Sequence, residues 1–344
     1  MTDERPPVEP VLQTELGALY AGDCVPLMRA LPAGSVDLFF ADPPFNLGKD
    51  YGVAAPDNHT EDRYLKWCFE WLSEGVRLLK PGGSMFVYNL PKWSIPIGEF
   101  LRTRLTFRHW ITVEIKFGLP ITGRLYPSHY GLLYFVKGKR PNRFDPPRLA
   151  MPTCRHCGGE IPDYGGYKDK MNPKGLNLSD VWSDIAPVRH SRFKNREANE
   201  LSLKLMDRVL DIGSAPGDIV LDPFGGAGTT YVAAELKHRR WIGMELSTAD
   251  AIVDRFADLS QDRANLRRYR SGINTLFTPE ALALRARSGM GRNNHRYNIE
   301  GAAPDARLNG EVHQLSLDTT ETVESIEGGL TKSPAVGSLP DERH

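Results

Sequence analysis

Residues 218–246 constrain the fold of this 344-residue chain more than any other segment. They begin with a short apolar run over 218–221, which predicts a buried strand. The turn DPFGGAGTT at 222–230 follows, and then come a helical pattern over 228–238 and a second apolar run over 241–246. A strand, a crossover helix and a strand form the unit from which parallel sheets are built. The segment therefore predicts an open, parallel sheet.

The same alternation of strands and helices occupies most of the chain before this segment. The expected elements are strands at 35–40, 85–89, 109–117 and 129–137 and helices at 62–80 and 197–210. The Pro-Gly-Gly sequence at 81–83 is expected to end the first helix, and the last two strands are expected to pair antiparallel. These elements predict an α/β fold with a Rossmann-like, mostly parallel sheet and helices on both faces. In such sheets, ligands bind beyond the carboxyl ends of the strands.

The turn at 222–230 has the composition of an anion-binding loop. Its glycines let the backbone approach a ligand closely, and the helix that follows presents unpaired N–H groups. The loop lacks the Lys that precedes Ser or Thr in a P-loop, which disfavours hydrolysis of nucleoside triphosphates. Glu245 stands 23 residues after Asp222, and an acid near this spacing binds ribose hydroxyls in nucleoside-cofactor folds. The segment predicts a nucleoside cofactor, either NAD or S-adenosylmethionine.

A second motif, ADPPFN at 41–46, follows the strand expected at 35–40. Asp42 can accept one hydrogen bond from an exocyclic amine, and the carbonyl of Pro43 can accept another. Pro43 and Pro44 keep the turn rigid, so both acceptors are fixed before a ligand arrives. Phe45 is available to stack on a base extruded from a duplex. This motif favours methyl transfer to an amino nitrogen, and so S-adenosylmethionine over NAD; the alternative is a proline-rich turn with a capping Asp and a core Phe.

Together the two motifs resemble those of the DNA amino methyltransferases. ADPPFN is similar to their catalytic motif, and VLDPFGGAGTT at 220–230 is similar to their cofactor loop. The order of the two, catalytic motif first, is that of the permuted group called beta class. The resemblance also takes in GDC at 22–24, LLKPGGSMFVY at 78–88 and NELSLKLMDRVL at 199–210. It covers roughly residues 15–260 and implies the permuted methyltransferase fold.

The resemblance also implies a role for each motif residue. The target amine and its base would be held by the catalytic residues Asp42, Pro43, Pro44 and Phe45. The S-adenosylmethionine site would comprise Asp23 near the adenine, Cys24, Glu245 at the ribose, the loop residues Asp222, Phe224, Gly226, Gly228 and Thr229, and Asn199, Glu200 and Thr230 near the methionine end.

The reaction that follows from these roles is site-specific methylation of adenine N6 in DNA. Adenine is favoured because the motif begins with Asp, whereas similar enzymes acting on cytosine N4 more often begin with Ser. The alternatives are cytosine-N4 methylation, RNA or protein amide methylation, a catalytically inactive DNA-binding regulator on the same fold, and a nicotinamide oxidoreductase. The expected partners are double-stranded DNA with a flipped target base and a cognate restriction endonuclease, and the chain is expected to act as a monomer or homodimer.

Charges are distributed unevenly along a chain whose formal net charge is zero. Residues 102–208 carry 20 Lys and Arg against 10 Asp and Glu, whereas residues 300–344 carry 3 against 9. The basic excess predicts DNA contacts in an irregular target-recognition insertion at 118–196; an ordinary loop-rich insertion is the alternative. The expected domains are two halves of a methyltransferase domain, 1–117 and 197–265, this insertion, and an extension over 266–344 with a disordered tail from about residue 300.

Cysteine spacing bears on zinc binding and disulfides, and the absence of long apolar runs bears on membrane association. Cys154 and Cys157 have the spacing of half a zinc site, but no second pair accompanies them, so two free thiols are favoured over zinc. Four cysteines are too few for a disulfide scaffold in a chain of this length. No signal peptide and no apolar run of about 18 residues occurs, so a cytoplasmic protein without membrane association is expected.

Overall fold

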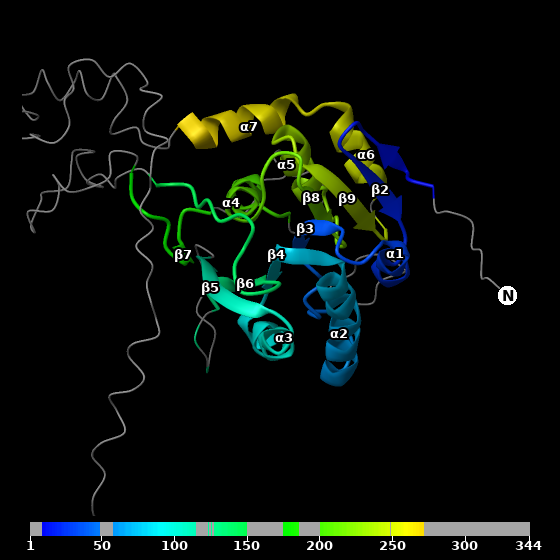
Figure 1. Cartoon of the computed structure of the whole chain (residues 1–344), viewed down its shortest axis with the longest axis vertical. Coiled ribbons are helices and arrows are strands. Elements are labelled where there is room, and N and C mark those ends of the chain that lie inside the picture. The colour runs from blue at the N-terminus through cyan, green and yellow to red at the C-terminus, as the bar shows by residue number, and fades with distance from the viewer. Residues whose placement is uncertain are drawn as a thin grey trace, which may run out of the picture. The chain divides into compact units, whose positions relative to one another are not determined.

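The two motifs follow neighbouring strands at the centre of one sheet. The computed structural model describes residues 9–48, 58–114, 123, 125, 127–149, 175–185, 200–247 and 249–271. Within these residues β8 (Ile219–Asp222), which leads into the glycine loop, pairs in parallel with β3 (Val36–Ala41), which leads into Asp42. Phe39 lies opposite Leu221. The sheet therefore brings together two motifs that are far apart in the sequence (Figure 1).

The sheet of the described residues has nine strands in the order β1-β2-β9-β8-β3-β4-β6-β5-β7. The strands from β2 to β4 run parallel, whereas β6 is antiparallel to both β4 and β5. The expected Rossmann-like, mostly parallel sheet is confirmed, and so is the antiparallel pair. The remaining strands are β1 (Leu12–Gln13), β2 (Gly17–Ala21), β9 (Arg240–Glu245), β4 (Leu79–Asn89), β6 (His129–Val136), β5 (Thr106–Glu114) and β7 (Val181–Trp182).

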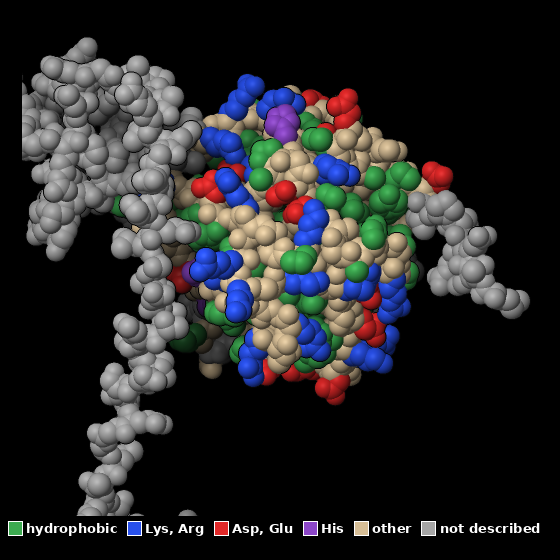
Figure 2. Space-filling model, in the orientation of Figure 1, with side chains coloured by type: hydrophobic (Ala, Val, Ile, Leu, Met, Phe, Trp, Pro, Cys, Tyr) green, Lys and Arg blue, Asp and Glu red, His purple; other side chains and the backbone are tan. Residues whose placement is uncertain are grey.

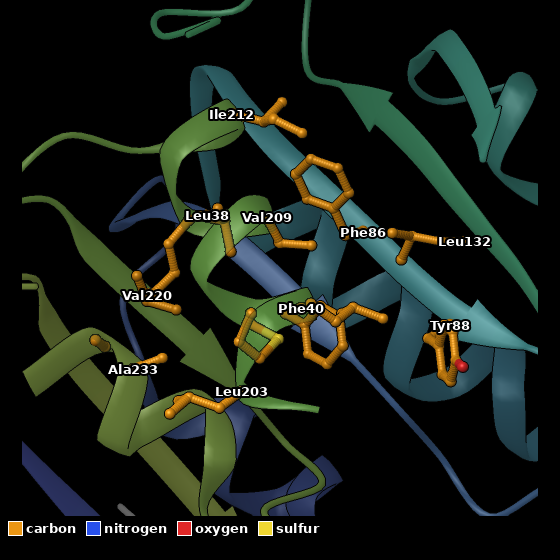
Figure 3. Packing of buried hydrophobic residues seen from close by; sticks show 14 of the residues in the cluster. Leu38, Phe40, Phe86, Tyr88, Leu132, Leu203, Val209, Ile212, Val220 and Ala233 are labelled. Carbon is orange, nitrogen blue, oxygen red and sulfur yellow. The ribbon is translucent and has the colours of Figure 1, made fainter. Parts of the chain in front are cut away.

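Helices cover both faces of the sheet because its central strands are apolar on both sides. In β3, Leu38 and Phe40 belong to one buried cluster, and Phe39 and Ala41 belong to the other. Figure 3 shows Leu38 and Phe40 packed with side chains of α4 and α5. None of the described helices is both long and apolar enough to cross a bilayer. The first face carries α4 (Leu203–Gly213), α5 (Thr229–Leu236), α6 (Ala249–Ala257) and α7 (Ser260–Ser271); the second carries α1 (Cys24–Ala30), α2 (Glu61–Leu78) and α3 (Pro91–Arg102).

The Pro-Gly-Gly sequence at 81–83 lies inside β4, so the expectation that it separates a helix from a strand is wrong. Val36 pairs with Leu79 and Leu38 pairs with Ser84, which leaves a bulge on β4 around these residues. Gly82 has a φ of 77° and donates its N–H to the carbonyl of Lys137 at 2.6 Å. A proline is tolerated here because the bulge interrupts the ladder that would otherwise require its N–H.

Helix α4 begins at Leu203 and continues to Gly213, later than the expected 197–210 at both ends. Ser202 has extended backbone and is the N-cap residue. The helix runs on past Leu210 because Ile212 is also buried in the core, and Ser214 then ends it by donating its N–H and hydroxyl to the Leu210 carbonyl. Residues 197–199 lie outside the described residues.

Helix α7 crosses residue 265, where the C-terminal extension was expected to begin. Leu266 is buried in the core, and Arg270 contacts Asp207 at 2.8 Å and Asp211 at 3.3 Å on α4. These contacts attach the helix to the sheet domain. Residues 272–344, with the tail expected from about residue 300, lie outside the described residues.

Candidate active site

Four acidic residues lie at or just beyond the carboxyl ends of four neighbouring parallel strands, at one edge of the sheet. Asp42 follows β3, Asp222 ends β8, Glu245 ends β9, and Asp23 comes two residues after β2. Carboxyl ends of parallel strands share an edge. The chain leaves β8 into α5 on one face and β3 into α2 on the other. The edge between β8 and β3 is therefore the topological switch point at which α/β folds bind ligands.

The carboxylates at this edge interact electrostatically. Burial raises the pKa of Asp222 well above its usual range, and the charges of Asp42 and Glu245 raise it further. Hydrogen bonds from Thr230 and from the N–H of Phe224, the latter at 2.9 Å, act in the opposite direction. A cation placed among these carboxylates would favour their ionised forms and would itself be stabilised by them. The edge is thus suited to a positively charged molecule.

The glycine loop is fastened to the acid of the next strand. Gly226 donates its N–H to Oε2 of Glu245 at 2.7 Å, and Ser247 donates its N–H to Oε1 at 3.0 Å. Gly228 is the N-cap of α5 with a φ of 73°, a conformation that glycine adopts without steric cost. Glu245 consequently holds the loop and lines the same site.

Tyr231 packs against the glycine loop through its hydroxyl and its ring. This residue was not identified from the sequence. Its buried hydroxyl donates to the Asp222 carbonyl at 2.9 Å and accepts the N–H of Met244 at 3.0 Å. A Cβ atom at Gly225 would lie 2.7 Å from this hydroxyl, and one at Gly243 would lie 2.7 Å from the ring. Part of the glycine content is therefore explained by packing rather than by a ligand.

Arg255 on α6 joins the loop to two other segments and was likewise missed. Its guanidinium donates to the Ala227 carbonyl at 2.7 Å and to Oγ1 of Thr229 at 3.0 Å. It also pairs with Glu200 at 3.4 Å and with Asp262 of α7 at 2.8 Å. The side chains of Arg255 and Glu200 are 4% and 3% exposed. Nothing in the local sequence around Arg255 marks it, because its partners lie on other segments.

The GDC sequence forms another wall of the site. Gly22 donates its N–H to the Glu245 carbonyl at 2.9 Å, which places the motif beside the end of β9. Asp23 caps α1 by accepting the N–H of Val25 at 2.9 Å. Burial raises the pKa of the Cys24 thiol far above its usual range, and Asp23 and Asp222 add to the effect. Cys24 is therefore an unreactive wall residue.

Three aromatic rings gather beside Asp42. Phe45 lies 5.5 Å from Tyr130 and 6.4 Å from Tyr88, and the two tyrosine rings are 5.0 Å apart. Burial raises the pKa of Tyr88, and the charge of Asp42 raises it further, so the carboxylate and the hydroxyl interact electrostatically. Tyr88 was not singled out from the sequence, and Tyr130 was assigned only to the basic segment. The only feature of the sequence that could have indicated Tyr88 and Tyr130 was their position near the ends of two expected strands.

Several other predicted residues have structural roles or lie outside the described residues. Thr229 and Thr230 are buried, and their hydroxyls bond to Arg255 and Asp222. Asn199, Cys154 and Cys157 lie outside the described ranges, and inside those ranges no group of three or more His, Cys, Asp or Glu could hold a metal ion.

Two residues of the 118–196 segment, which was expected to contact DNA, are used by the fold. Lys137 donates from Nζ to the carbonyls of Val76 and Leu79 at 2.8 Å, and Trp182 is buried with its Nε1 bonded to the Ser179 carbonyl. Figure 2 shows Lys and Arg scattered among acidic and apolar side chains over the visible face of the described residues. Within the described part of the segment, Lys137 and Trp182 therefore serve the packing of the fold.

Comparisons with known proteins agree with this geometry. A family model described as DNA methylase matches residues 36–251. The type II methyltransferase M.BamHI of Bacillus amyloliquefaciens is 48% identical over 311 residues, which are 90% of this chain and 74% of that protein. The DNA adenine methyltransferase YhdJ of Escherichia coli strain K12 is 31% identical over 245 residues, covering 68% of this chain and 80% of that protein. Among solved structures, the cytosine-N4-specific PvuII DNA methyltransferase has a TM-score of 0.54 at 18% identity and covers 77% of this chain and 95% of its own, a likeness of fold.

Proposed function

This chain belongs to the N6/N4 family of DNA methylases, and we propose that it methylates an exocyclic amino group of a base in DNA at a specific sequence. The observation that carries the proposal is the position of the turn at 42–46. Asp42 lies between the glycine loop, where its charge acts on Asp222, and the ring cluster of Phe45, Tyr88 and Tyr130. The target amine and the methyl donor would thus meet at Asp42.

The described residues fit S-adenosylmethionine, which supplies an activated methyl group when bound. We propose that Glu245 accepts the ribose hydroxyls, that Asp23 and Cys24 line the adenine, and that the loop with Asp222 and Phe224 surrounds the rest. The negative charge of this edge suits a sulfonium cation. Asn199, Glu200, Thr229 and Thr230 complete the proposed set, with Glu200 and Thr229 acting through Arg255.

Catalysis on this chain's side is proposed to consist of holding and orienting the amine. The Asp42 carboxylate accepts one N–H of the amine, and the Pro43 carbonyl accepts the other, which directs the nitrogen lone pair at the methyl carbon. The amine nitrogen would take the methyl group as the sulfur keeps the electron pair of the broken carbon–sulfur bond, and the proton lost from the nitrogen would pass to water. Positioning of this kind supplies much of the rate in reactions of an activated donor.

Adenine N6 is the first choice of target because the motif begins with Asp. The two acceptors match an amino group rather than one particular ring, so cytosine N4 is the second candidate. Names among the similar proteins include both bases. We further propose that the target base is flipped out of double-stranded DNA, that the insertion at 118–196 reads the sequence, and that the cell carries a cognate restriction endonuclease.

A labelling experiment tests the proposed function. The full-length protein is incubated with unmethylated DNA and S-adenosylmethionine labelled in the methyl group, and the DNA is digested to nucleosides that are separated by chromatography. Label in N6-methyladenine is expected. Label in N4-methylcytosine would support the same mechanism but show that the target is cytosine N4 and not adenine N6. Absence of label in any nucleoside, over DNA of varied sequence, would reject methylation of DNA.

Arg255→Met is expected to weaken cofactor binding and to lower stability. The variant removes the ion pair between Arg255 and the buried Glu200 carboxylate and the 2.7 Å hydrogen bond to the Ala227 carbonyl. Removing one partner of a buried ion pair costs about 3–5 kcal/mol of unfolding free energy. The dissociation constant for S-adenosylmethionine should rise about tenfold as the loop loosens.

Calorimetric titration and urea unfolding measure these two effects. Arg267→Met is the matched control, since Arg267 is exposed on the neighbouring helix α7. Equal behaviour of the two variants would show that Arg255 does not hold the loop.

A further inference from the structure

Two carbonyls of the turn at 42–46 are held from outside by buried side chains of neighbouring helices. The hydroxyl of Tyr64, in the first turn of α2, donates to the Pro44 carbonyl at 2.7 Å. Nε1 of Trp93, in the first turn of α3, donates to the Phe45 carbonyl at 2.8 Å. Tyr64 is 1% exposed and Trp93 is 3% exposed. Neither bond exchanges readily with water, so together they hold the turn against α2 and α3.

A third buried residue fixes the donor direction of Tyr64. Asn89, the last residue of β4, donates from Nδ2 to the Tyr64 hydroxyl at 3.2 Å and accepts the N–H of Leu90 at 2.7 Å. A tyrosine oxygen that accepts this bond retains one proton to donate, and it goes to Pro44. The rings of Tyr64 and Trp93 are 4.6 Å apart, so each side chain also restricts the other.

Holding these two carbonyls also fixes the groups proposed to bind the amine. The φ angle of Pro44 is locked by its ring, so once the Pro44 carbonyl is held, only rotation about ψ of Pro44 can move the preceding peptide plane, which carries the Pro43 oxygen. The Phe45 carbonyl is fixed in the same way, which holds the Phe45 ring against Tyr88 and Tyr130. The amine acceptor and the stacking ring are consequently set by one hydrogen-bonded network.

We propose that Tyr64 and Trp93 are positioning residues for methyl transfer, acting through the Pro44 and Phe45 carbonyls and not through contact with the substrate. The inference rests on the proposed function, since the turn must hold the target amine for its position to affect the rate. Cofactor binding depends on other contacts, those of the glycine loop and Glu245. The two residues should therefore affect kcat and not the affinity for S-adenosylmethionine.

Tyr64→Phe and Trp93→Phe each remove one donor and keep an aromatic ring. Misplacement of reacting groups by about 1 Å costs up to about a hundredfold in rate, so we expect kcat to fall about 10- to 100-fold in each variant. The dissociation constant for S-adenosylmethionine should stay within about twofold. In the double variant the combined loss should be smaller than the product of the single losses, because both bonds hold the same turn.

Tyr134→Phe is the matched control, because it also removes a buried tyrosine hydroxyl, one that lies 3.4 Å from Ser84 Oγ and away from the turn. Hydrogen exchange of the peptide covering 40–48 in the full-length protein provides a readout independent of activity. Exchange there should be at least about tenfold faster in Tyr64→Phe and Trp93→Phe than in the wild type and the control. Thermal unfolding midpoints identify any variant that fails to fold. If one of the two variants fails to fold, the kcat and the exchange rate of the other test the proposal.

Three results would overturn the proposal. They are wild-type kcat in both folded variants, cofactor affinity that falls in parallel with kcat, and an equal loss of kcat in Tyr134→Phe. If the wild type labels no nucleoside, the proposed function fails by itself. The exchange measurement then still decides whether Tyr64 and Trp93 hold the turn, and unchanged exchange would reject the inference.

Discussion

Asp42→Ala is expected to lower kcat at least about a thousandfold, the upper end of the effect of removing one preorganised hydrogen-bonding group from an active site. The carboxylate is proposed to accept a hydrogen bond from the target amine, and no other acidic residue in the described part of the chain occupies the turn after β3. Alanine removes this acceptor and leaves the rings of Phe45, Tyr88 and Tyr130 in place. Single-turnover methylation of DNA measures the loss.

Cofactor affinity should remain within about twofold of the wild type in Asp42→Ala. The substitution removes a negative charge that raises the pKa of Asp222, so the pKa of Asp222 should fall and its carboxylate should remain ionised more readily. Glu99→Ala is the control, because Glu99 is an exposed acid on α3 that pairs with Arg102. A parallel loss of S-adenosylmethionine binding would contradict the assignment of Asp42 to the amine.

Glu245→Ala is expected to have effects opposite to those of Asp42→Ala, with a large loss of cofactor affinity and a small change in kcat. Hydrogen bonds to a charged group contribute about 1.5–3 kcal/mol each, so loss of the proposed ribose contacts should raise the dissociation constant for S-adenosylmethionine at least about a hundredfold. The variant also removes the 2.7 Å hydrogen bond from the N–H of Gly226 to Glu245. At saturating cofactor, kcat should stay within about tenfold of the wild type.

Glu245→Gln provides a graded comparison. Its amide oxygen can still accept from Gly226, but the charge and one acceptor are lost, so its affinity for the cofactor should lie between those of the wild type and Glu245→Ala. Calorimetric titration measures all three proteins. Affinity unchanged in Glu245→Ala, or a loss confined to kcat, would remove Glu245 from the cofactor site.

Both motifs and the type of sheet that carries them were predictable, because the residue patterns that indicate them lie within short segments of the chain. The glycine loop is marked by its own residues, and ADPPFN is marked by the carboxylate, prolines and ring beside one another. The boundaries of α4 and β4 were less predictable. They depend on a bulge around Gly82 and on the continuation of the core to Ile212, which arise from contacts with other elements.

The residues that complete the site were not predictable, because each acts across elements. Tyr88 and Tyr130 meet Phe45 only because β4 and β6 are neighbours in the sheet. Arg255 reaches the Ala227 carbonyl only because α6 packs beside the loop. No spacing along the chain encodes either contact.

By itself, the sequence determined the α/β class and the position of both motifs at the carboxyl ends of strands, and it predicted their chemistry, since side-chain chemistry, apolar periodicity and strand polarity are properties of short segments. Tertiary structure alone decided which side chains hold the motifs in place. Tyr64 and Trp93 lie on separate helices, and their hydrogen bonds to Pro44 and Phe45 exist only where packing buries the donors against those carbonyls. Such bonds depend on distance and direction in space, which a linear pattern does not specify.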